Sequence, residues 1–426
     1  MALSTRAVQT YQNASTTDQL IMMLNNLYDA ETNPDGYVSL GIAENSLMHH
    51  VLIDHMHKNI DIPDLALTYG NGQKRLRKVA ARFLSRHFKP VTPIEPSHIH
   101  ISNGLAPAIQ NIAWATANPG DALLLGRPYY VAFKPDVSRR TGVEVLPVAF
   151  GDLDPMGVEA VQKYEDEILK AKDRGQRIAG VILAHPHNPL GRCYPRDVLI
   201  AFMRLCQKHQ IHLISDEIYA LSVFENRVDK DAAAVPFESV LSIDPEGIID
   251  PSLIHVLWGM SKDFGANGLR MGITITQHNP NMQAALMSVF EFSWTSSLSD
   301  LVTANALDDD EWVESYIKEN QTKLSEHQEK VLLWAKQNEI EYSRGSNAGF
   351  FVWVNLGAVY SKHHPGEIEH LDKAVIDALL AKKVFLADGI AFGAEQPGWF
   401  RIIFSQEAGY LAEGLRRIMA AVKGEQ

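Results

Sequence analysis

Cysteine is almost missing from this chain, which has only Cys193 and Cys206 among its 426 residues. Two cysteines cannot build a disulfide framework or a four-cysteine zinc site, and they favour a reducing compartment. No stretch approaches the roughly 18 to 20 apolar residues of a membrane span, and residues 1–12 lack the apolar core of a secretory signal. We therefore expect a soluble, cytoplasmic protein without a membrane partner.

Positive charge is also scarce. Lys and Arg total 39 against 51 Asp and Glu, which gives a formal net charge of −12 with His neutral. A protein that binds the nucleic-acid backbone needs a clustered cationic surface, so this composition argues against nucleic acid as a partner. The 46% hydrophobic and 21% charged residues are ordinary for a globular protein, and the length allows two or three domains.

Histidine is plentiful at 17, and His49, His50, His55 and His57 form a cluster. No carboxylate or cysteine completes a recognisable ligand set with them, so we predict no metal site. A dinucleotide loop is also not expected at residues 69–72, because no strand precedes them and a third glycine is missing.

The chain alternates short apolar runs with helical patterns up to about residue 275. This rhythm is typical of a largely parallel sheet with covering helices, and residues 64–88 carry one such helical pattern. After residue 305 we expect a long helix to about Asn338, two further strands and two helices in a smaller α/β domain. The expected strands are residues 143–148, 178–184, 211–215, 254–258, 350–356 and 399–404, and the expected late helices are 367–382 and 410–422.

Chemically useful residues follow four of these runs. Ligands bind outside the carboxyl ends of the strands in open parallel sheets. Asn188, Asp216 and Lys262 each stand just after a run, and Arg401 follows Pro397-Gly398-Trp399-Phe400. These groups suit pyridoxal 5′-phosphate: the lysine can form a Schiff base, the carboxylate can keep the pyridine nitrogen protonated, and the arginine can hold a substrate carboxylate.

The ordered motifs resemble those of the class I/II aminotransferase superfamily, and most closely its 1-aminocyclopropane-1-carboxylate synthase branch. The resemblance implies an aspartate-aminotransferase-like α/β fold, in which a mostly parallel seven-stranded sheet between helices forms a large domain beside a smaller α/β domain. It divides the chain into residues 1–60 (an arm and part of the small domain), 61–305 (the cofactor domain) and 306–426 (the small domain). The motifs are Gly41-Ile42-Ala43-Glu44-Asn45, Pro128-Tyr129-Tyr130, Asn188-Pro189-Leu190-Gly191, Asp216-Glu217-Ile218-Tyr219, Ser261-Lys262 with Arg270, and Pro397-Gly398-Trp399-Phe400-Arg401.

The resemblance also implies a role for each matching residue. Lys262 would hold the cofactor and move the substrate α-proton. Asp216 would pair with the pyridine nitrogen, Asn188 and Tyr219 would contact the ring oxygen, and Tyr130 would stack on the ring. Arg270 and Ser261 would bind the phosphate, with Arg401 and Asn188 at the substrate carboxylate.

Two further residues match positions of the synthase branch. Tyr69 matches a tyrosine that reaches the neighbouring subunit's cofactor, which implies a homodimer with shared active sites. Glu44 matches a glutamate near the substrate, and both residues are candidate catalytic and substrate-binding groups.

Each of these residues has a simpler alternative. Lys262 could be a solvated lysine, Asp216 a helix N-cap and Arg401 a strand-edge charge. Tyr130 could be a core aromatic and Glu44 a solvated turn carboxylate.

The phosphate site departs from the family pattern. Gly104, Leu105 and Ala106 stand where relatives place small and hydroxyl residues. We expect their backbone N–H groups at a helix start to bind the cofactor phosphate, although Pro107 supplies no N–H group. Gly259 replaces the usual hydroxyl three residues before Lys262. We expect modestly weaker cofactor retention, which Gly259→Ser would improve, and His187 has no assigned role.

The expected function is α-proton removal from an amino acid by Lys262, followed by one of three reactions. Glu44 and Tyr69 favour γ-elimination, cyclisation or replacement on S-adenosylmethionine or a similar substrate, and a role in specialised metabolism is plausible. An aminotransferase is the alternative, and a C–S lyase is another. A non-catalytic cofactor-binding regulator is the alternative from a different class.

Overall fold

The computed structural model describes residues 3–12, 21–69, 73–366 and 368–425. Leu20, Glu367 and the turn residues 70–72, which enter the sequence-based predictions, lie outside these ranges.

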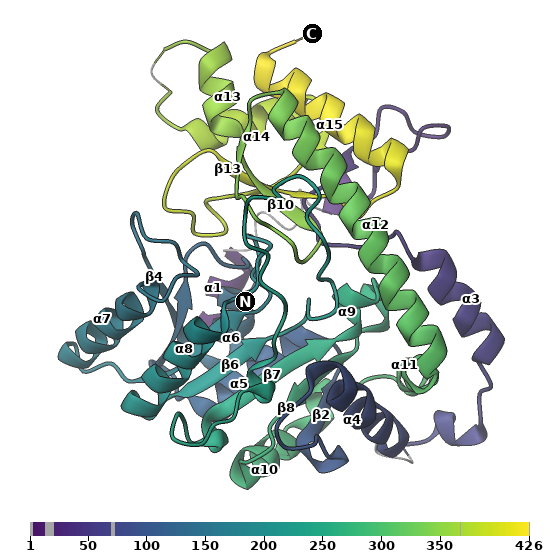
Figure 1. Ribbon diagram of the computed structural model, residues 1–426, viewed down its shortest axis with the longest axis vertical. Helices are drawn as coiled ribbons and strands as arrows, with labels where there is room; N and C mark the ends of the chain where they lie inside the picture. Colours follow the sequence, from purple (N-terminus) through teal and green to yellow (C-terminus); the bar gives the residue numbers. More distant parts are fainter. Residues whose placement is uncertain (1–2, 13–20, 70–72, 367, 426) are drawn as a thin grey trace.

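The larger sheet has seven strands in the order β2-β8-β7-β6-β5-β3-β4 (Figure 1). Strand β8 runs antiparallel to both of its neighbours, and every other pairing is parallel. The predicted mostly parallel seven-stranded sheet is therefore confirmed. Its strands are β2 (Ile99–Ser102), β3 (Ala122–Gly126), β4 (Glu144–Val148), β5 (Ile178–Ala184), β6 (His212–Asp216), β7 (Ile254–Gly259) and β8 (Gly272–Ile275).

Helices cover both faces of this sheet. Helices α5 (Leu105–Thr116) and α6 (Phe133–Thr141) share a hydrophobic cluster with strand residues such as Leu125 and Ile182. The alternate residues, such as Leu124 and Val181, belong to the cluster of the opposite face. Because both faces are buried, the strands are nearly continuous apolar runs. The helices of that opposite face include α4 (Lys74–Phe88), α7 (Ala160–Asp173) and α8 (Arg196–His209).

The smaller sheet is antiparallel, with the order β12-β13-β10-β9. Helices α13 (Leu356–His363), α14 (Leu371–Ala381) and α15 (Ala408–Lys423) pack around it, at the top of Figure 1. Its strands are β9 (Glu341–Tyr342), β10 (Phe351–Asn355), β12 (Ala387–Asp388) and β13 (Trp399–Ile403).

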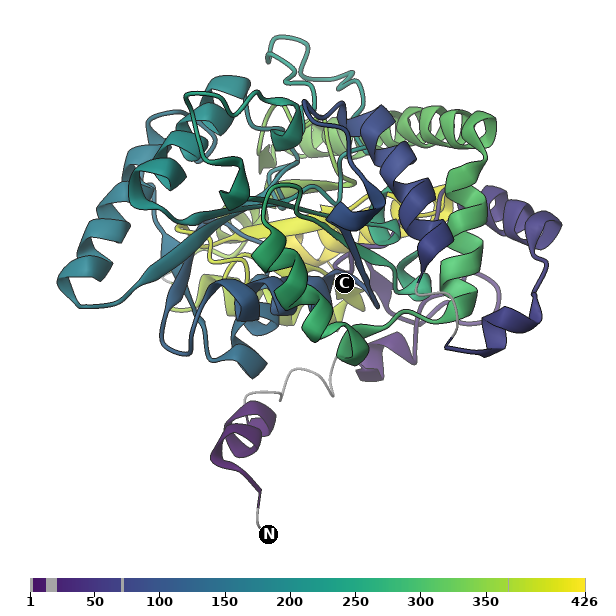
Figure 2. The ribbon, with the colours of Figure 1, turned by 90° about the horizontal axis from the view of Figure 1, so that it is seen from below.

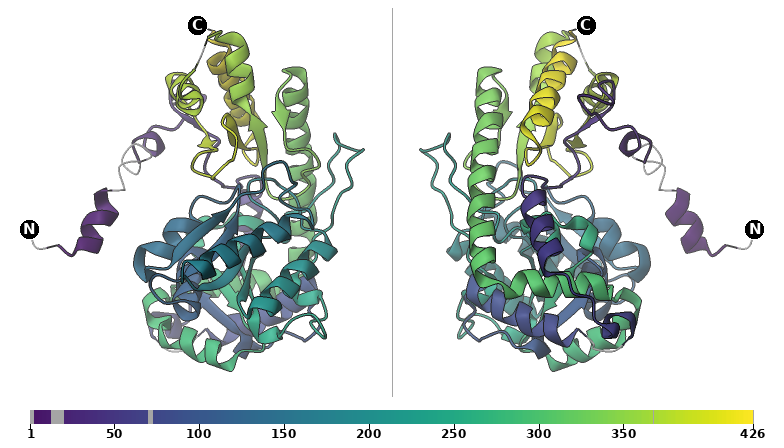
Figure 3. Two further views of the ribbon diagram at one scale, coloured as in Figure 1. Left: turned by 90° about the vertical axis from the view of Figure 1, so that its left-hand side faces the viewer. Right: turned by 90° about the vertical axis from the view of Figure 1, so that its right-hand side faces the viewer.

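Helix α12 (Asp310–Gln337) ties the two sheets together (Figure 3). The Asp309 side chain accepts a hydrogen bond from Trp312 N and caps the helix start, in the acidic segment where we expected it. At 28 residues the helix is about 42 Å long. Val313 packs in the core of the larger sheet and Val331 in that of the smaller one, so one helix serves both cores. Domain boundaries at residues 60 and 305 stay a prediction.

Residues before α4 connect the N-terminal part to both sheets. Strand β1 (Val38–Ser39) pairs in parallel with β11 (Val384–Phe385) beside the smaller sheet. Residues 41–43 follow β1, and α3 (His49–Asn59) then leads toward the larger sheet. Helix α1 (Thr5–Gln12) stands away from the rest of the chain (Figures 2 and 3).

Some elements differ from the sequence-based expectation. The helix predicted at 64–88 is a 3₁₀ turn, η1 (Asp64–Leu67), and a separate helix, α4. The strand predicted at 350–356 ends at Asn355, whose side chain caps α13 by accepting from Ala358 N. Cys193 and Cys206 are buried and unpaired. In the described ranges no helix is long and apolar enough to cross a membrane.

Candidate active site

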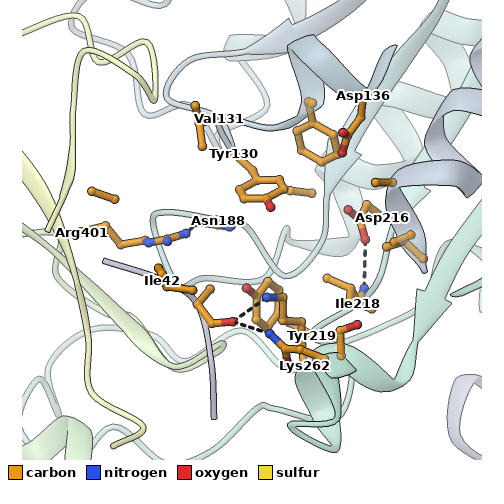
Figure 4. A pocket seen from close by; sticks show the side chains of 18 of the residues that line it. Ile42, Tyr130, Val131, Asp136, Asn188, Asp216, Ile218, Tyr219, Lys262 and Arg401 are labelled. Carbon is orange, nitrogen blue, oxygen red and sulfur yellow. Dashed lines mark hydrogen bonds between the residues drawn. The ribbon is translucent and has the colours of Figure 1, made fainter. Parts of the chain in front are cut away.

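A cavity of about 440 Å³ opens at the carboxyl ends of β5, β6 and β7. Its walls come from the loops after these strands, the first turns of α5, residues 130–136, residues 41–43 and residues 385–401. Figure 4 shows Tyr130, Asn188, Asp216, Lys262 and Arg401 around one common space. Asn188, Asp216 and Lys262, which the sequence placed after three separate strands, therefore meet Arg401 of β13 in one cavity.

Lys262 lies on α9 (Met260–Asp263), a single helical turn that begins directly after β7. Its Nζ donates a hydrogen bond of 2.6 Å to the carbonyl of Ala43. Burial lowers the pKa of Lys262 to about 7, helped by the Arg401 cation and opposed by the acidic groups of Glu44 and Asp216. Lys262 is therefore not a solvated lysine, and much of it is a neutral, nucleophilic amine at neutral pH.

Asp216 is the last residue of β6, opposite Leu257 of β7. Burial raises its pKa to about 7, although Ile218 N donates to its carboxylate at 3.2 Å and Lys262 attracts its charged form. The residues that follow form a turn and not a helix, so the helix N-cap alternative is wrong. A buried carboxylate that faces the cavity is placed to pair with a cationic ligand group.

Arg401 lies on β13 with 3% of its surface exposed. One terminal nitrogen donates to Asn188 Oδ1 at 2.9 Å and the other to Gly41 O at 2.7 Å. Within the described part of the chain no Asp or Glu forms an ion pair with it, and its Nε has no hydrogen-bond partner. A buried guanidinium without a carboxylate is costly, so this geometry favours an anionic ligand.

Two tyrosines approach the same space. The Tyr219 hydroxyl is buried and has no hydrogen-bond partner among the described residues. Burial raises its pKa, which keeps the hydroxyl a donor. An unsatisfied buried donor costs about 1–3 kcal/mol, which suggests an acceptor on a ligand. Tyr130 lines the cavity with its ring edge-to-face against Phe133 at 5.6 Å, so it is not simply a core aromatic.

The start of α5 forms an anion cradle beside Arg270. Gly104 caps the helix with φ +110°, a conformation that side chains rarely adopt, and a Cβ there would overlap the Arg270 guanidinium. Leu105 and Ala106 supply the first helical N–H groups, while Pro107 supplies none. A helix start next to an arginine is suited to a phosphate.

The missing hydroxyl at Gly259 has a structural reason. A Cβ at Gly259 would overlap the carbonyl of Met271, and one at Gly272 would overlap the carbonyl of Gly104. Strands β7 and β8 and the start of α5 thus approach too closely for a side chain. This contact argues against the improved cofactor retention expected from Gly259→Ser, because the serine side chain would push β8 away. Ser261 does line the cavity beside Lys262.

Glu44 and Tyr69 lie outside the cavity lining of this chain. The Glu44 side chain is exposed, and its backbone carbonyl accepts from Ser405 Oγ at 2.7 Å. It still attracts the Lys262 ammonium, so it lies near the cavity without lining it. Tyr69 is 92% exposed, with its ring centroid 6.2 Å from that of Trp294.

Asp136 lines the cavity but was not predicted. It lies in the first turn of α6, and burial raises its pKa to about 6, while Arg139 and Arg270 oppose this. The signal in the sequence was weak, because an acid in the first turn of a helix is common. Asp136 follows the predicted cofactor residue Tyr130 by only six positions, and this closeness could have indicated that it lines the same cavity.

The histidines have structural contacts. His187 is buried, and its Nδ1 accepts a long hydrogen bond of 3.4 Å from Leu190 N, which stabilises the turn that presents Asn188. His49 bonds Gly265 O, and His55 bonds Asp309. Among the described residues no group of three or more His, Cys, Asp or Glu could hold a metal ion.

Comparison with known proteins supports these observations. The model of the family "Aminotransferase class I and II" matches residues 35–418. The mouse "1-aminocyclopropane-1-carboxylate synthase-like protein 1" is 32% identical over 410 residues, which cover 93% of this chain and 78% of that protein. "1-aminocyclopropane-1-carboxylate synthase 2" of Arabidopsis thaliana is 31% identical over 386 residues, 88% of this chain and 76% of that protein.

One relative is named as inactive. The mouse "Probable inactive 1-aminocyclopropane-1-carboxylate synthase-like protein 2" is 30% identical over 390 residues, which cover 89% of this chain. The matched part is 64% of that relative's length. The aspartate aminotransferase of Thermus thermophilus with maleate has the same fold: the TM-score is 0.75 with 20% identity, over 99% of this chain and all of that one.

Proposed function

Because the chain belongs to the aminotransferase class I and II family, we propose that it is an enzyme that acts on an α-amino acid through Lys262 and Arg401. The observation that carries this proposal is the buried Arg401, for which the described residues provide no acidic partner. It is a ready site for the α-carboxylate of the substrate, in fork-to-fork contact.

Pyridoxal 5′-phosphate is the cofactor of this family, and the cavity fits it. An unpartnered tyrosine hydroxyl, a buried carboxylate and an anion cradle face the same space as the reactive lysine. When bound, the cofactor supplies an aldehyde for a Schiff base and a protonated ring that withdraws electrons from the substrate α-carbon.

Each lining residue has a proposed task toward that group. The N–H groups of Leu105 and Ala106 would hold the phosphate together with Arg270 and Ser261. The carboxylate of Asp216 would keep the ring nitrogen protonated, and that cation would in turn favour the charged form of Asp216.

Three residues complete the contacts. Tyr219 would donate its hydroxyl, which has no partner among the described residues, to the ring oxygen. Asn188 would donate to the same oxygen from its amide nitrogen, since its Oδ1 already accepts from Arg401. Tyr130, which lines the cavity, would cover one face of the cofactor ring.

Lys262 carries the proton of the reaction. Its neutral amine takes the proton from the substrate α-carbon, and its depressed pKa lets it release that proton at a second carbon. The aromatic and aliphatic walls keep water from the reacting atoms.

We expect the rate of cofactor attachment to depend on pH through Lys262. The neutral amine is the nucleophile, so the rate should rise about tenfold per pH unit below pH 7 and level off above the pKa of about 7. The absorbance change after mixing cofactor-free protein with pyridoxal phosphate between pH 5.5 and 9.5 measures this. A rate that is still rising steeply at pH 9.5 would mean an ordinary lysine.

Transamination is the reaction that the described cavity supports best. It needs proton transfer by Lys262 and a site for the α-carboxylate, and both are present. The expectation of γ-elimination on S-adenosylmethionine rested on Glu44 and Tyr69, and neither lines the cavity of this chain. That reaction is the second candidate, because Tyr69 is exposed and available to another subunit.

An assay with both substrate types separates these reactions. We expect an amino acid and a 2-oxo acid to exchange their amino group, with no methylthioadenosine formed from S-adenosylmethionine, as measured by mass spectrometry. Methylthioadenosine in the absence of amino exchange would contradict transamination and support the synthase-like reaction. Release of a thiol would instead indicate C–S lysis, and neither activity in cofactor-loaded protein would favour a non-catalytic regulator.

We propose a homodimer as the active form. Exposed apolar side chains gather near the anion cradle. The ring of Tyr69 contacts that of Trp294. On either side of Trp294, Ser293 O accepts from Asn103 N and Thr295 Oγ1 donates to Arg270 O. Leu67 and Phe292 are also largely exposed there. Burial of such side chains by a second copy is favourable and would bring Tyr69 toward the neighbouring cavity.

A further inference from the structure

The end of the cavity that holds Arg401 has apolar walls. The guanidinium carbon lies 4.8 Å from the ring centroid of Phe392 and 5.5 Å from that of Phe351. Ile42 lies beside Arg401 in Figure 4, and Val131 lies across the space from it. A substrate whose carboxylate contacts Arg401 therefore meets hydrocarbon around that contact.

Backbone pairing fixes two more parts of this wall. Ala387 of β12 lies directly opposite Arg401 of β13. Phe385 packs on Gly41, where a Cβ would lie only 2.8 Å from its ring, and the Gly41 carbonyl is the acceptor of Arg401. Strand pairing thus fixes the positions of both apolar neighbours beside Arg401.

The other charged side chains that line the cavity lie away from Arg401. In the described part of the cavity they are Asp136, Asp216, Lys262 and Arg270. In Figure 4 Asp136 and Asp216 lie on the side of Tyr130 away from Arg401. Arg270 packs against Gly104 at the cradle. Among the described lining residues of this chain, a charged substrate side chain beside Arg401 would therefore find no partner of opposite sign other than Arg401, which the α-carboxylate occupies.

The free energy of moving a substrate side chain from water to this apolar wall then determines which substrates fit. Apolar groups gain free energy when they leave water for such a wall. A carboxylate or ammonium would lose its hydration without a compensating ion pair, which costs more than any neutral group loses. We infer that the substrate is an α-amino acid with a neutral, apolar side chain, such as a branched aliphatic, thioether or aromatic one, with Ile42, Val131, Phe385 and Phe392 as specificity-determining residues.

This inference rests on the proposed function, and a panel of amino donors tests it on the cofactor-loaded enzyme. Leucine, methionine and phenylalanine should each have a kcat/KM at least about 100-fold above those of aspartate, glutamate and lysine. S-adenosylmethionine, whose sulfonium is a cation, should have a kcat/KM as low as those of the charged donors. Equal or higher values for the charged donors would overturn the inference.

Binding without turnover gives a second readout. 4-Methylpentanoate carries one carboxylate and an apolar tail, whereas glutarate carries a second carboxylate at similar length. The apolar acid should raise the Tm of the cofactor-loaded protein, and glutarate at the same concentration should not. A larger shift with glutarate would overturn the inference.

A single new charge should reverse this preference. Val131 lines the cavity and is 39% exposed, so Val131→Arg can keep its guanidinium partly in water. We expect glutarate to bind Val131→Arg at least about tenfold more tightly than it binds the wild type. Val158→Arg is the matched control, because Val158 is 44% exposed and does not line the cavity, and it should change nothing.

The outcomes separate this inference from the proposed function. If neither acid binds and no amino acid exchanges its amino group, the proposed function fails and the inference falls with it. If glutarate and acidic donors work as well as the apolar ones, the enzyme stands and only the inference is overturned.

Discussion

Replacing Lys262 with alanine is expected to lower kcat by about 10⁴-fold, the upper end of what a positioned acid–base group contributes. The amine is both the attachment point and the proton carrier in the proposed mechanism, and Nζ is already fixed by its 2.6 Å bond to Ala43 O. Steady-state amino exchange measures the rate. The absorbance band of the lysine-bound cofactor, near the short-wavelength end of the visible range, should disappear in the same variant.

Lys323→Ala is the control for this change. Lys323 also donates to a backbone carbonyl, that of Leu47, but it lies outside the cavity lining. Its loss should leave the rate and the absorbance unchanged. Full activity in Lys262→Ala would contradict the assignment of the lysine.

Replacing Arg401 with alanine is expected to lower kcat/KM by about 30- to 4,000-fold, because loss of one partner of a buried charged pair costs about 2–5 kcal/mol. The substrate carboxylate would keep only neutral contacts near Asn188. Cofactor absorbance should persist, since no cofactor contact is proposed for Arg401. Spectral titration and initial rates with one amino acid measure the effect.

Arg401→Lys tests whether the planar fork matters beyond its charge. Lysine has no planar fork and only three N–H donors, so it cannot give a substrate carboxylate two hydrogen bonds while it also bonds Asn188 Oδ1 and Gly41 O, and recovery should be partial. Thermal unfolding of both variants checks that the fold is intact. A kcat/KM equal to that of the wild type in folded Arg401→Ala would contradict the carboxylate role.

The larger sheet was predictable where apolar runs are long and end in distinctive residues. The runs that end near Asn188, Asp216 and Lys262 form β5, β6 and β7. Strands β2, β3 and β8 of this sheet were missed, because Ile99–Ser102, Ala122–Gly126 and Gly272–Ile275 have only four or five residues each and too little periodicity. Helix α13 was missed because Leu356 continues the apolar run of β10.

The part of the site that lies at the strand ends was also predictable. Side chains next to strand ends must share one edge of a parallel sheet, so their meeting follows from topology. The apolar wall beside Arg401 could not be predicted in this way, because Phe385 reaches Gly41 only through the two-residue pairing of β1 with β11. The close backbone contact that excludes a side chain at Gly259 also depends on the packing of β8, which a sequence does not reveal.

Covalent attachment of the cofactor to Lys262 underlies every step of the proposed mechanism. Borohydride reduction of the cofactor-loaded protein, followed by digestion and mass spectrometry, locates the modified residue directly. The account predicts a pyridoxyl-phosphate group on the peptide that contains Ser261-Lys262, in near-stoichiometric amount. A modification on another lysine, or none on protein that has bound the cofactor, would contradict it.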